Sequence, residues 1–148
     1  MTETLYYKSP VGGLILKADS ALFELKPGTS SAPEKTDNQI LNMCKHWLDI
    51  YFSGREPDFA PPVRLDVPGF AQRVLSELKN VSYGSVISYS ELARRLGNKN
   101  AARAVGRALS LNPVFIIVPC HRVIAAHGIG GYAGGIKMKS ELLRLEQK

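Results

Sequence analysis

The segment Pro119-Cys120-His121-Arg122 holds the residue types best suited to covalent chemistry in this chain. A cysteine thiolate is a strong nucleophile, but a free thiol has a pKa of ~8.5 and needs help from a base or a positive charge at neutral pH. His121 and Arg122 follow Cys120 directly and are groups of those two kinds. Residue types alone leave two interpretations open, a reactive nucleophile and a buried structural thiol.

The position of His121 limits how it could act on Cys120. Side chains of adjacent residues in an extended chain point to opposite sides, so His121 reaches the sulfur only through a turn or a bridging water. A base of this kind also needs a group that orients it. Glu146 is a candidate, on a helix predicted over Lys139 to Gln147 with Leu142, Leu143 and Leu145 on its apolar face. The alternative interpretation of Glu146 is a solvated charge near the chain end.

The other cysteine, Cys44, lies on the apolar face of a helix predicted from Ile40 to Tyr51, where it reads as a small buried hydrophobe. Two cysteines are too few for a disulfide framework. Cys44 and His46 form the one candidate ligand pair and lack a second pair at a zinc-binding spacing. We therefore expect no metal.

Two further segments must position the reactive group. The apolar run from Val114 to Val118 is rich in β-branched residues and predicts a buried strand that ends at Cys120. The stretch from Gly128 to Gly135 contains five glycines and Tyr132, and such a loop could wrap closely around a flat ligand. It is not a phosphate loop, because no Gly-Lys-Ser/Thr follows.

A helix-turn-helix is predicted upstream of that run. Ser88 to Glu91 matches a capping box, and the short helix that follows through Leu96 stops at Gly97-Asn98. A second helix is expected from about Asn100 to Leu111, with an apolar stripe at i, i+3, i+4, i+7 and i+8. Its outward face carries small residues and two arginines: Ala102, Arg103, Gly106, Arg107 and Ser110. Small side chains let a backbone approach DNA without reading base edges, which suits an enzyme that works at many sequences.

Charge is divided unevenly along the chain. Residues 1–62 carry six Lys/Arg and eight Asp/Glu, a net of −2, whereas residues 63–148 carry thirteen and five, a net of +8. A basic region of this kind points to a polyanionic partner such as nucleic acid. The prolines between Pro57 and Pro68 mark a linker, so we predict an acidic domain over residues 1–61 and a basic one over residues 62–148.

The remaining N-terminal segments predict a small mixed domain. Leu5 to Lys26 alternates apolar and polar residues around a turn at Pro10–Gly13, and a loop from Pro27 to Asp37 follows. A helix from Phe70 to Val81 is expected after the linker, closed by a turn at Tyr83-Gly84. No stretch approaches the ~20 apolar residues of a membrane-spanning helix, and the N-terminus lacks a signal-peptide pattern. We expect a cytoplasmic protein with no membrane partner.

These residues together resemble a known family. The run from Pro119 to Ile124, preceded by Asn112-Pro113 and followed by Gly131-Tyr132-Ala133-Gly134-Gly135, resembles the O6-alkylguanine-DNA alkyltransferases, also called methylated-DNA–protein-cysteine methyltransferases. The similarity runs from Phe70 to Glu146 and includes Tyr83-Gly84, Ser88-Tyr89, Ala101 to Gly106 and Leu142 to Glu146. Weaker N-terminal matches are Ser9 to Gly12 and Tyr51 to Gly54.

The resemblance implies an α+β fold and a function. A ribonuclease H-like N-terminal subdomain, with a short antiparallel sheet and a helix, would precede a mainly helical, winged helix-turn-helix domain. The chain would flip O6-alkylguanine out of double-stranded DNA and transfer the alkyl group irreversibly to Cys120, once per molecule and without a metal or organic cofactor. O4-alkylthymine would react less well. The protein would bind the minor groove as a monomer, largely independent of sequence.

The resemblance also implies residue roles. His121 would deprotonate Cys120 through a water, oriented by Glu146, while Asn112 would brace the segment and Tyr89 would donate a proton to the leaving guanine. Four residues would form the substrate pocket: Val123, Tyr132, Ala133 and Gly134. Arg103 would fill the gap left by the flipped base, and further DNA contacts would come from Tyr89, Ser90, Asn98, Ala102, Gly106 and Arg107.

Two departures from the family pattern lie away from the chemistry. Leu75 stands where many members have tryptophan, and the N-terminal part lacks the cysteine and histidine spacing of zinc-binding members. Three other functions stay open. They are a non-enzymatic alkyltransferase-like protein, which the presence of Cys120 disfavours, a helix-turn-helix regulator with an incidental thiol, and a Cys-His hydrolase that turns over many times.

Overall fold

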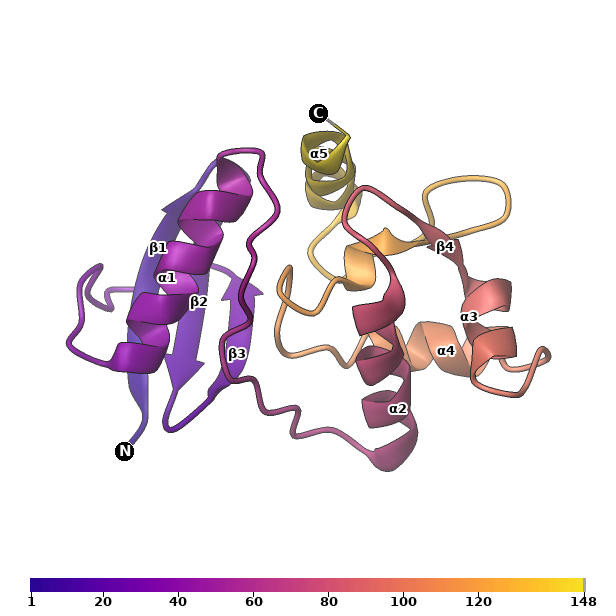
Figure 1. Ribbon diagram of the computed structural model, residues 1–148, viewed down its shortest axis with the longest axis horizontal. Coiled ribbons are helices and arrows are strands. Elements are labelled where there is room, and N and C mark those ends of the chain that lie inside the picture. Colours follow the sequence, from indigo (N-terminus) through magenta and orange to yellow (C-terminus); the bar gives the residue numbers. More distant parts are fainter. Residues whose placement is uncertain (148) are drawn as a thin grey trace. The chain divides into compact units, whose positions relative to one another are not determined.

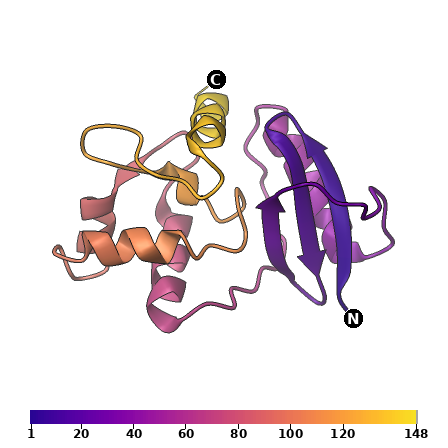
Figure 2. The same ribbon diagram turned by 180° about the vertical axis from the view of Figure 1, so that it is seen from behind.

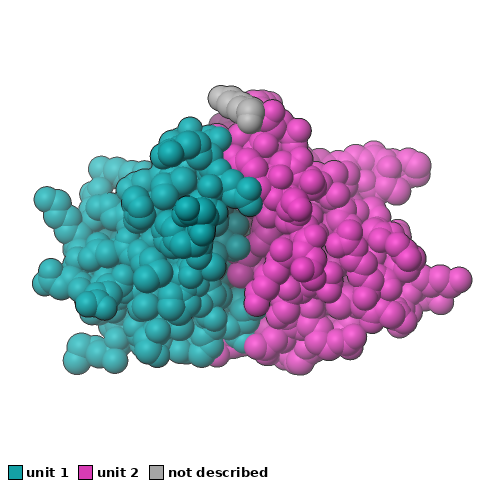
Figure 3. All heavy atoms as spheres, in the orientation of Figure 1, with its two compact units in different colours: residues 1–65, 113–117, 148 teal, residues 66–112, 118–147 magenta. Residues whose placement is uncertain are grey.

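A computed structural model describes residues 1–147 of the chain, which form two compact units (Figure 3). Unit 1 comprises residues 1–65 and 113–117, and unit 2 comprises residues 66–112 and 118–147. Each unit has its own buried apolar side chains. Across the described residues, no helix is long and apolar enough to cross a membrane.

Unit 1 is built on a three-stranded antiparallel sheet in the order β1-β2-β3: β1 is Glu3–Ser9, β2 is Gly12–Ala18 and β3 is Leu22–Pro27. Buried and less buried residues alternate along β2, so one face of the sheet forms the core. Helix α1 (Gln39–Phe52) covers one face of the sheet (Figures 1 and 2). It begins where the Asn38 side chain accepts a hydrogen bond from the Leu41 amide, an N-cap. The predicted sheet and helix are confirmed.

The proline-rich stretch after α1 is bonded to the sheet. The Leu22 amide donates to the Pro62 carbonyl at 2.8 Å, and the Arg64 amide donates to the Leu22 carbonyl at 2.9 Å. Leu22 thereby forms a parallel bridge with Val63. The last part of the predicted linker is therefore held against β3 by main-chain hydrogen bonds.

The predicted strand from Val114 to Val118 is wrong. Only Val114 forms a bridge, with Leu25 of β3, and the chain then turns. The Ile117 amide donates to the Phe115 carbonyl at 2.8 Å, which closes a γ-turn centred on Ile116, and Ile116 has φ of 73°. Left-handed φ is unusual for a β-branched residue and introduces local strain. The β-branched run is thus buried in a turn and not in a strand.

Unit 2 is mainly helical, as predicted. Helix α4 (Ala102–Leu109) packs against both α2 (Gly69–Glu77) and α3 (Tyr89–Arg95) (Figure 1). Ser88 accepts a hydrogen bond from the Glu91 amide at 3.0 Å and so caps α3, whereas the Glu91 carboxylate pairs with Arg94. The helical elements in this part of the chain are α2 (Gly69–Glu77), the 3-10 helix η1 (Leu78–Asn80), α3 (Tyr89–Arg95), α4 (Ala102–Leu109) and α5 (Ile136–Glu146).

Two short strands in unit 2 were not predicted. Strand β4 (Ile87–Ser88) pairs in parallel with β5 (Val123–Ile124). Between Pro119 and β5 the chain forms a 3-10 helix, η2 (Cys120–Arg122). Because β4 leads directly into α3, this pairing brings the start of α3 beside the segment that carries Cys120.

The last helix begins three residues earlier than predicted. Gly135 has φ of 97° and its carbonyl accepts a hydrogen bond from the Lys139 amide at 3.1 Å, so α5 starts at Ile136. The sequence pattern missed this first turn because Ile136 is exposed and Lys137 is polar. Gln147 caps the other end of the helix.

Candidate active site

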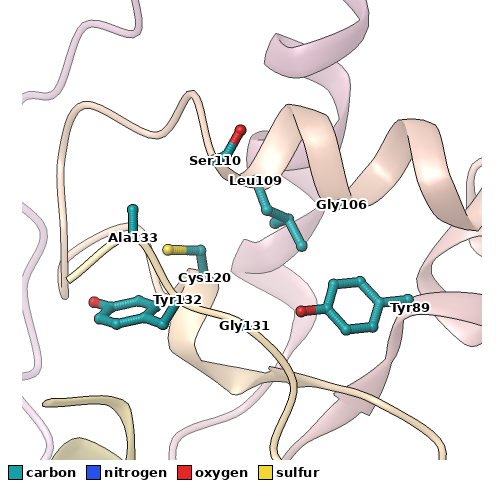
Figure 4. Close-up of a pocket in the computed structure, with 8 residues that line it drawn as sticks. All are labelled: Tyr89, Gly106, Leu109, Ser110, Cys120, Gly131, Tyr132 and Ala133. Atoms are coloured by element: carbon teal, nitrogen blue, oxygen red, sulfur yellow. The ribbon is translucent and has the colours of Figure 1, made fainter. Parts of the chain in front are cut away.

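A pocket of about 240 Å³ lies within unit 2 between α4 and the glycine-rich loop (Figure 4). This volume is below the ~300–1,000 Å³ typical of pockets for drug-sized ligands, so the pocket suits a small molecule. Figure 4 shows the Cys120 side chain at the pocket and the Tyr89 hydroxyl pointing toward it from the other side. The residues that line the pocket are Tyr89, Gly106, Leu109, Ser110, Cys120, Gly131, Tyr132 and Ala133.

The Cys120 thiol is 7% exposed and is held by Asn112. The Asn112 side-chain amide donates to the Cys120 sulfur at 3.1 Å and to the Val118 carbonyl at 3.0 Å. Burial raises the pKa of Cys120 to about 11, while the Asn112 hydrogen bond and the positive charge of Lys139 oppose that rise. Cys120 therefore rests as a neutral thiol and needs a base to react.

His121, the residue that follows Cys120, is fully buried. Its ring contacts Glu146. The His121 Nε2 and Glu146 Oε2 atoms are 2.6 Å apart. Burial lowers the pKa of His121 and outweighs the opposing effect of Glu146, so the imidazole is neutral at neutral pH. Since a carboxylate only accepts hydrogen bonds, Nε2 carries the proton and Nδ1 carries the lone pair. A neutral histidine in this tautomer can act as a base through Nδ1.

Glu146 is held by two further donors in addition to His121. Its Oε1 accepts from the Arg122 Nε at 2.8 Å and from the Gly84 amide at 3.2 Å. Arg122 also donates to the Val81 carbonyl at 2.8 Å. Glu146 is only 4% exposed, so its interpretation as a solvated charge is wrong. Three donors on one buried carboxylate fix its charge and its orientation.

Glycine is required at two positions that hold this arrangement. Gly84 has φ of 79°, and a Cβ there would lie 3.2 Å from the Glu146 carbonyl oxygen. Gly130 also has φ of 79°, and a Cβ there would lie 2.9 Å from the Tyr89 hydroxyl oxygen. Any larger residue at Gly130 would displace the Tyr89 hydroxyl.

Two of the four predicted pocket residues line the pocket. Tyr132 and Ala133 line the pocket, and burial raises the pKa of Tyr132, so its hydroxyl stays protonated. Val123 lies in β5 directly after η2, whereas Gly134 is not among the lining residues.

The predicted DNA-contacting residues differ in exposure. Gly106 lines the pocket and Ala102 is half-buried beside it on α4. The other four predicted contacts besides Tyr89 are exposed: Ser90, Asn98, Arg103 and Arg107. Arg103 is thus on the surface of α4 and not among the pocket residues.

Lys139 also lies in this region, although no sequence motif pointed to it. It is fully buried on α5, and its Nζ donates to the Val123 carbonyl at 2.6 Å and to the Gly131 carbonyl at 3.0 Å. Its position one turn before Leu142 and Leu143 places it near the apolar face of the helix. That spacing was the available signal, but a lysine there usually reaches solvent with its long side chain.

Comparisons with known proteins identify the family of this chain. Residues 3–65 match the family model described as "6-O-methylguanine DNA methyltransferase, ribonuclease-like domain", and residues 69–148 match its DNA binding domain. The chain belongs to the 6-O-methylguanine DNA methyltransferase family. The family therefore confirms the fold class and the resemblance inferred from the sequence.

Several members of the 6-O-methylguanine DNA methyltransferase family cover nearly the whole chain. A methylated-DNA–protein-cysteine methyltransferase of Metallosphaera sedula is 38% identical over 143 residues, which are 95% of this chain and 90% of that protein. One of Sulfolobus acidocaldarius is 39% identical over 141 residues, with 95% and 90% covered. The crystal structure of the Mycobacterium tuberculosis O6-methylguanine methyltransferase is 38% identical, with a TM-score of 0.86 over 99% of this chain and 93% of that one. A crystal structure of the M. tuberculosis protein in complex with DNA has a TM-score of 0.88, over 98% of this chain and 92% of that one.

Proposed function

We propose that this chain repairs DNA by direct damage reversal, as a methylated-DNA–protein-cysteine methyltransferase that moves the alkyl group of O6-alkylguanine onto Cys120. Residues 62–148 act as the DNA-binding and alkyl-acceptor domain. The observation that carries the proposal is the pocket next to the Cys120 sulfur, together with the neutral His121 that Glu146 orients. Family membership supports the same reaction.

The reaction uses groups that this chain supplies. The Cys120 proton passes through a bridging water to Nδ1 of His121, and Glu146 stabilises the imidazolium that forms. The thiolate attacks the alkyl carbon, a sulfur–carbon bond forms, and the carbon–O6 bond breaks with its electrons moving to guanine. Tyr89 donates a proton to the departing guanine, and solvent then restores the protonation states of Tyr89 and His121. The thioether on Cys120 is stable, so each molecule reacts once.

Access to the base requires that it leave the duplex. Chemistry on a stacked base is sterically blocked, and flipping costs a few kcal/mol. We propose that α4 lies in the minor groove with Ala102 and Gly106 facing the DNA. The exposed Arg103 takes the place of the flipped base in the stack. The small side chains of Ala102 and Gly106 on this face suit binding that is largely independent of sequence, by a monomer. O4-alkylthymine is a poorer substrate in this proposal.

A single incubation tests the reaction. The protein is mixed with a duplex oligonucleotide carrying O6-methylguanine, and intact mass and peptide mapping follow. We expect one added methyl group per protein molecule, located on Cys120. An unmodified protein, or repair of more than one equivalent of substrate, would contradict the proposal. The second result would indicate a hydrolase, and tight binding to one particular sequence would indicate a regulator.

The role of Arg103 needs its own comparison. Arg103→Ala is expected to slow transfer from duplex DNA by at least about tenfold while leaving transfer from the free base O6-benzylguanine almost unchanged, because only the duplex requires flipping. Arg144→Ala is the matched control, since Arg144 is an exposed arginine on α5. Equal losses on both substrates would count against the assignment.

A further inference from the structure

The turn between η1 and β4 holds two charged groups of the candidate active site. The Val81 carbonyl accepts a hydrogen bond from Arg122 at 2.8 Å, and the Gly84 amide donates one to Glu146 Oε1 at 3.2 Å. Glu146 is also the partner of the His121 ring, with 2.6 Å between Oε2 and Nε2. The position of this turn therefore bears on the orientation of the histidine base.

Gly84 is bound on both sides by consecutive residues at the end of α5. Its amide donates to the Glu146 carboxylate, and its carbonyl accepts a hydrogen bond from Gln147 Nε2 at 2.9 Å. The backbone approach is also close, because a Cβ added at Gly84 would lie 3.2 Å from the Glu146 carbonyl oxygen. The two hydrogen bonds span 62 and 63 residues of sequence. They dock the end of α5 against the turn.

The bond from Gln147 matters because a glycine does not fix the direction of its own backbone groups. Glycine has more conformational freedom than any other residue, and Gly84 is held at a φ of 79°. A hydrogen bond on its carbonyl restrains ψ, while the bond on its amide restrains φ. Gln147 thereby helps to set the direction in which the Gly84 amide meets Glu146.

The Gly84 amide makes the longest of the three contacts to the Glu146 carboxylate described above. The other two, to His121 and Arg122, measure 2.6 and 2.8 Å, whereas the amide lies at 3.2 Å. That distance is at the upper end of the range for an N–H···O hydrogen bond, so a small displacement breaks it. Its loss would leave Oε1 of Glu146 with one donor fewer and free the carboxylate to turn.

We propose that Gln147 is a positioning residue for alkyl transfer, which acts on the His121 base through the Gly84 amide. This inference rests on the proposed function and adds a residue to its machinery. Gln147 is exposed and carries no charge, and it is not one of the residues that line the pocket. Its contribution is therefore geometric. It keeps the amide on Glu146, and Glu146 in turn keeps the lone pair of His121 Nδ1 directed at the water that receives the thiol proton.

Three variants isolate the hydrogen bond of Gln147. Gln147→Met keeps the length of the side chain and removes the donor, whereas Gln147→Arg restores an N–H donor that can reach the Gly84 carbonyl. Gln72→Met is the matched control, since Gln72 is an exposed glutamine on α2. The single-turnover rate of transfer from O6-methylguanine in duplex DNA is measured at saturating protein. The Kd of each protein for the unmodified duplex is measured beside it.

Gln147→Met should lower the saturating transfer rate by about three- to tenfold, which is the range expected for the loss of one hydrogen bond that aligns the base. The Kd for duplex DNA should stay unchanged, because Gln147 acts on the chemical step. Gln147→Arg should recover most of the lost rate, and Gln72→Met should match the wild-type protein. A wild-type rate in Gln147→Met, a change confined to Kd, or no recovery in Gln147→Arg overturns the proposal.

A double variant separates positioning of the base from a general loosening of the fold. Glu146→Ala removes the carboxylate through which Gln147 is proposed to act, so adding Gln147→Met should change the remaining rate by less than about twofold. A further loss of about three- to tenfold would show that Gln147 acts by another route, and it overturns the proposal. If Glu146→Ala does not fold, the single variants of the exposed Gln147 still decide the question.

Failure of this inference differs from failure of the proposed function. If the wild-type protein transfers no methyl group, the proposed function fails. If the wild-type protein transfers and Gln147→Met keeps its rate, only the role of Gln147 is overturned. Thermal unfolding of each variant gives the folded fraction at the assay temperature. A slower rate that disappears after correction for that fraction also overturns the positioning role.

Discussion

Cys44 and Cys120 are both buried free thiols, yet the groups around them differ in kind. Cys44 lies on α1 among apolar side chains such as Leu41 and Leu48, and burial alone raises its pKa to about 12. Burial also raises the pKa of Cys120, to about 11, but Asn112 and Lys139 act in the opposite direction. Cys120 further faces a pocket and precedes a histidine held by a carboxylate. Burial therefore protects a thiol, and polar partners together with an opening make it usable.

Replacing each thiol in turn should give the largest contrast. Cys120→Ala is expected to abolish methyl transfer while DNA binding remains, because the acceptor atom is lost. Cys44→Ala should keep the wild-type transfer rate and lower the free energy of unfolding by about 0.5–3 kcal/mol, since it only removes core volume. Transfer by mass spectrometry and unfolding in urea measure the two effects. Methylation of Cys44 in the Cys120→Ala protein would erase the contrast.

Glu146→Gln should disable the base beside Cys120 without touching Cys44. Removing the carboxylate leaves His121 without its anionic partner, and we expect transfer to slow by about 10²–10⁴-fold. Unfolding should become easier by about 3 kcal/mol, because Arg122 loses its buried partner. Glu141→Gln on the same helix is the control, as that side chain is 31% exposed. Stopped-flow or quench assays of transfer would show the difference, and a wild-type rate in Glu146→Gln would remove Glu146 from the mechanism.

Asn112→Ala tests the donor that distinguishes the two thiols. Without the amide, the pH midpoint of Cys120 alkylation should rise, whereas that of Cys44 should not move. The Val118 carbonyl also loses its partner, which should lower the free energy of unfolding by about 1–3 kcal/mol. Iodoacetamide labelling followed by peptide mapping reports both thiols in one sample. Equal shifts at both sites would indicate a general loosening of the fold.

The smallest effect is shared by the two thiols and appears at alkaline pH. Both native thiol pKa values lie above the ~8.5 of a thiol in an unfolded chain. The contribution of each neutral thiol to the free energy of unfolding is therefore complete below that pH. It is lost as pH rises toward about 11 for Cys120 and about 12 for Cys44, because the unfolded state loses its protons first. The Cys44→Ala and Cys120→Ala double variant should therefore lose less stability than wild type between pH ~7.5 and ~9.5, by about 1 kcal/mol per thiol. Urea unfolding at the two pH values measures this, and identical losses would contradict it.

Much of this arrangement could be predicted from the sequence because it depends on local patterns. The alternation in β1 to β3, the apolar face of α1 and the Ser88 cap are short-range signals, and the structure contains these strands, this helix and this cap. The reactive segment and its resemblance to the family could likewise be recognised, because the residues that carry them are adjacent in the sequence.

The remaining features depend on contacts between distant segments. The pairing of Ile87 with Val123 and the burial of Glu146 under the Gly84 amide join residues far apart in the chain. The run from Val114 to Val118 was misassigned because apolar, β-branched residues suit a buried turn as well as a strand. Lys139 was missed for a similar reason, since nothing local distinguishes a buried lysine from a solvated one.

The bridge between Val114 and Leu25 limits how this chain can be divided into separately expressed fragments. Residues 113–117 belong to unit 1, although they lie in the sequence between two pieces of unit 2. The Leu25 amide donates to the Pro113 carbonyl and the Phe115 amide donates to the Leu25 carbonyl, both at 2.8 Å. A fragment expressed from residue 66 onward would lack β3 and both bonds, worth about 0.5–1.5 kcal/mol each. Split reporters and minimal fusion tags built on this scaffold should therefore supply β3 as a separate peptide or keep the N-terminal half.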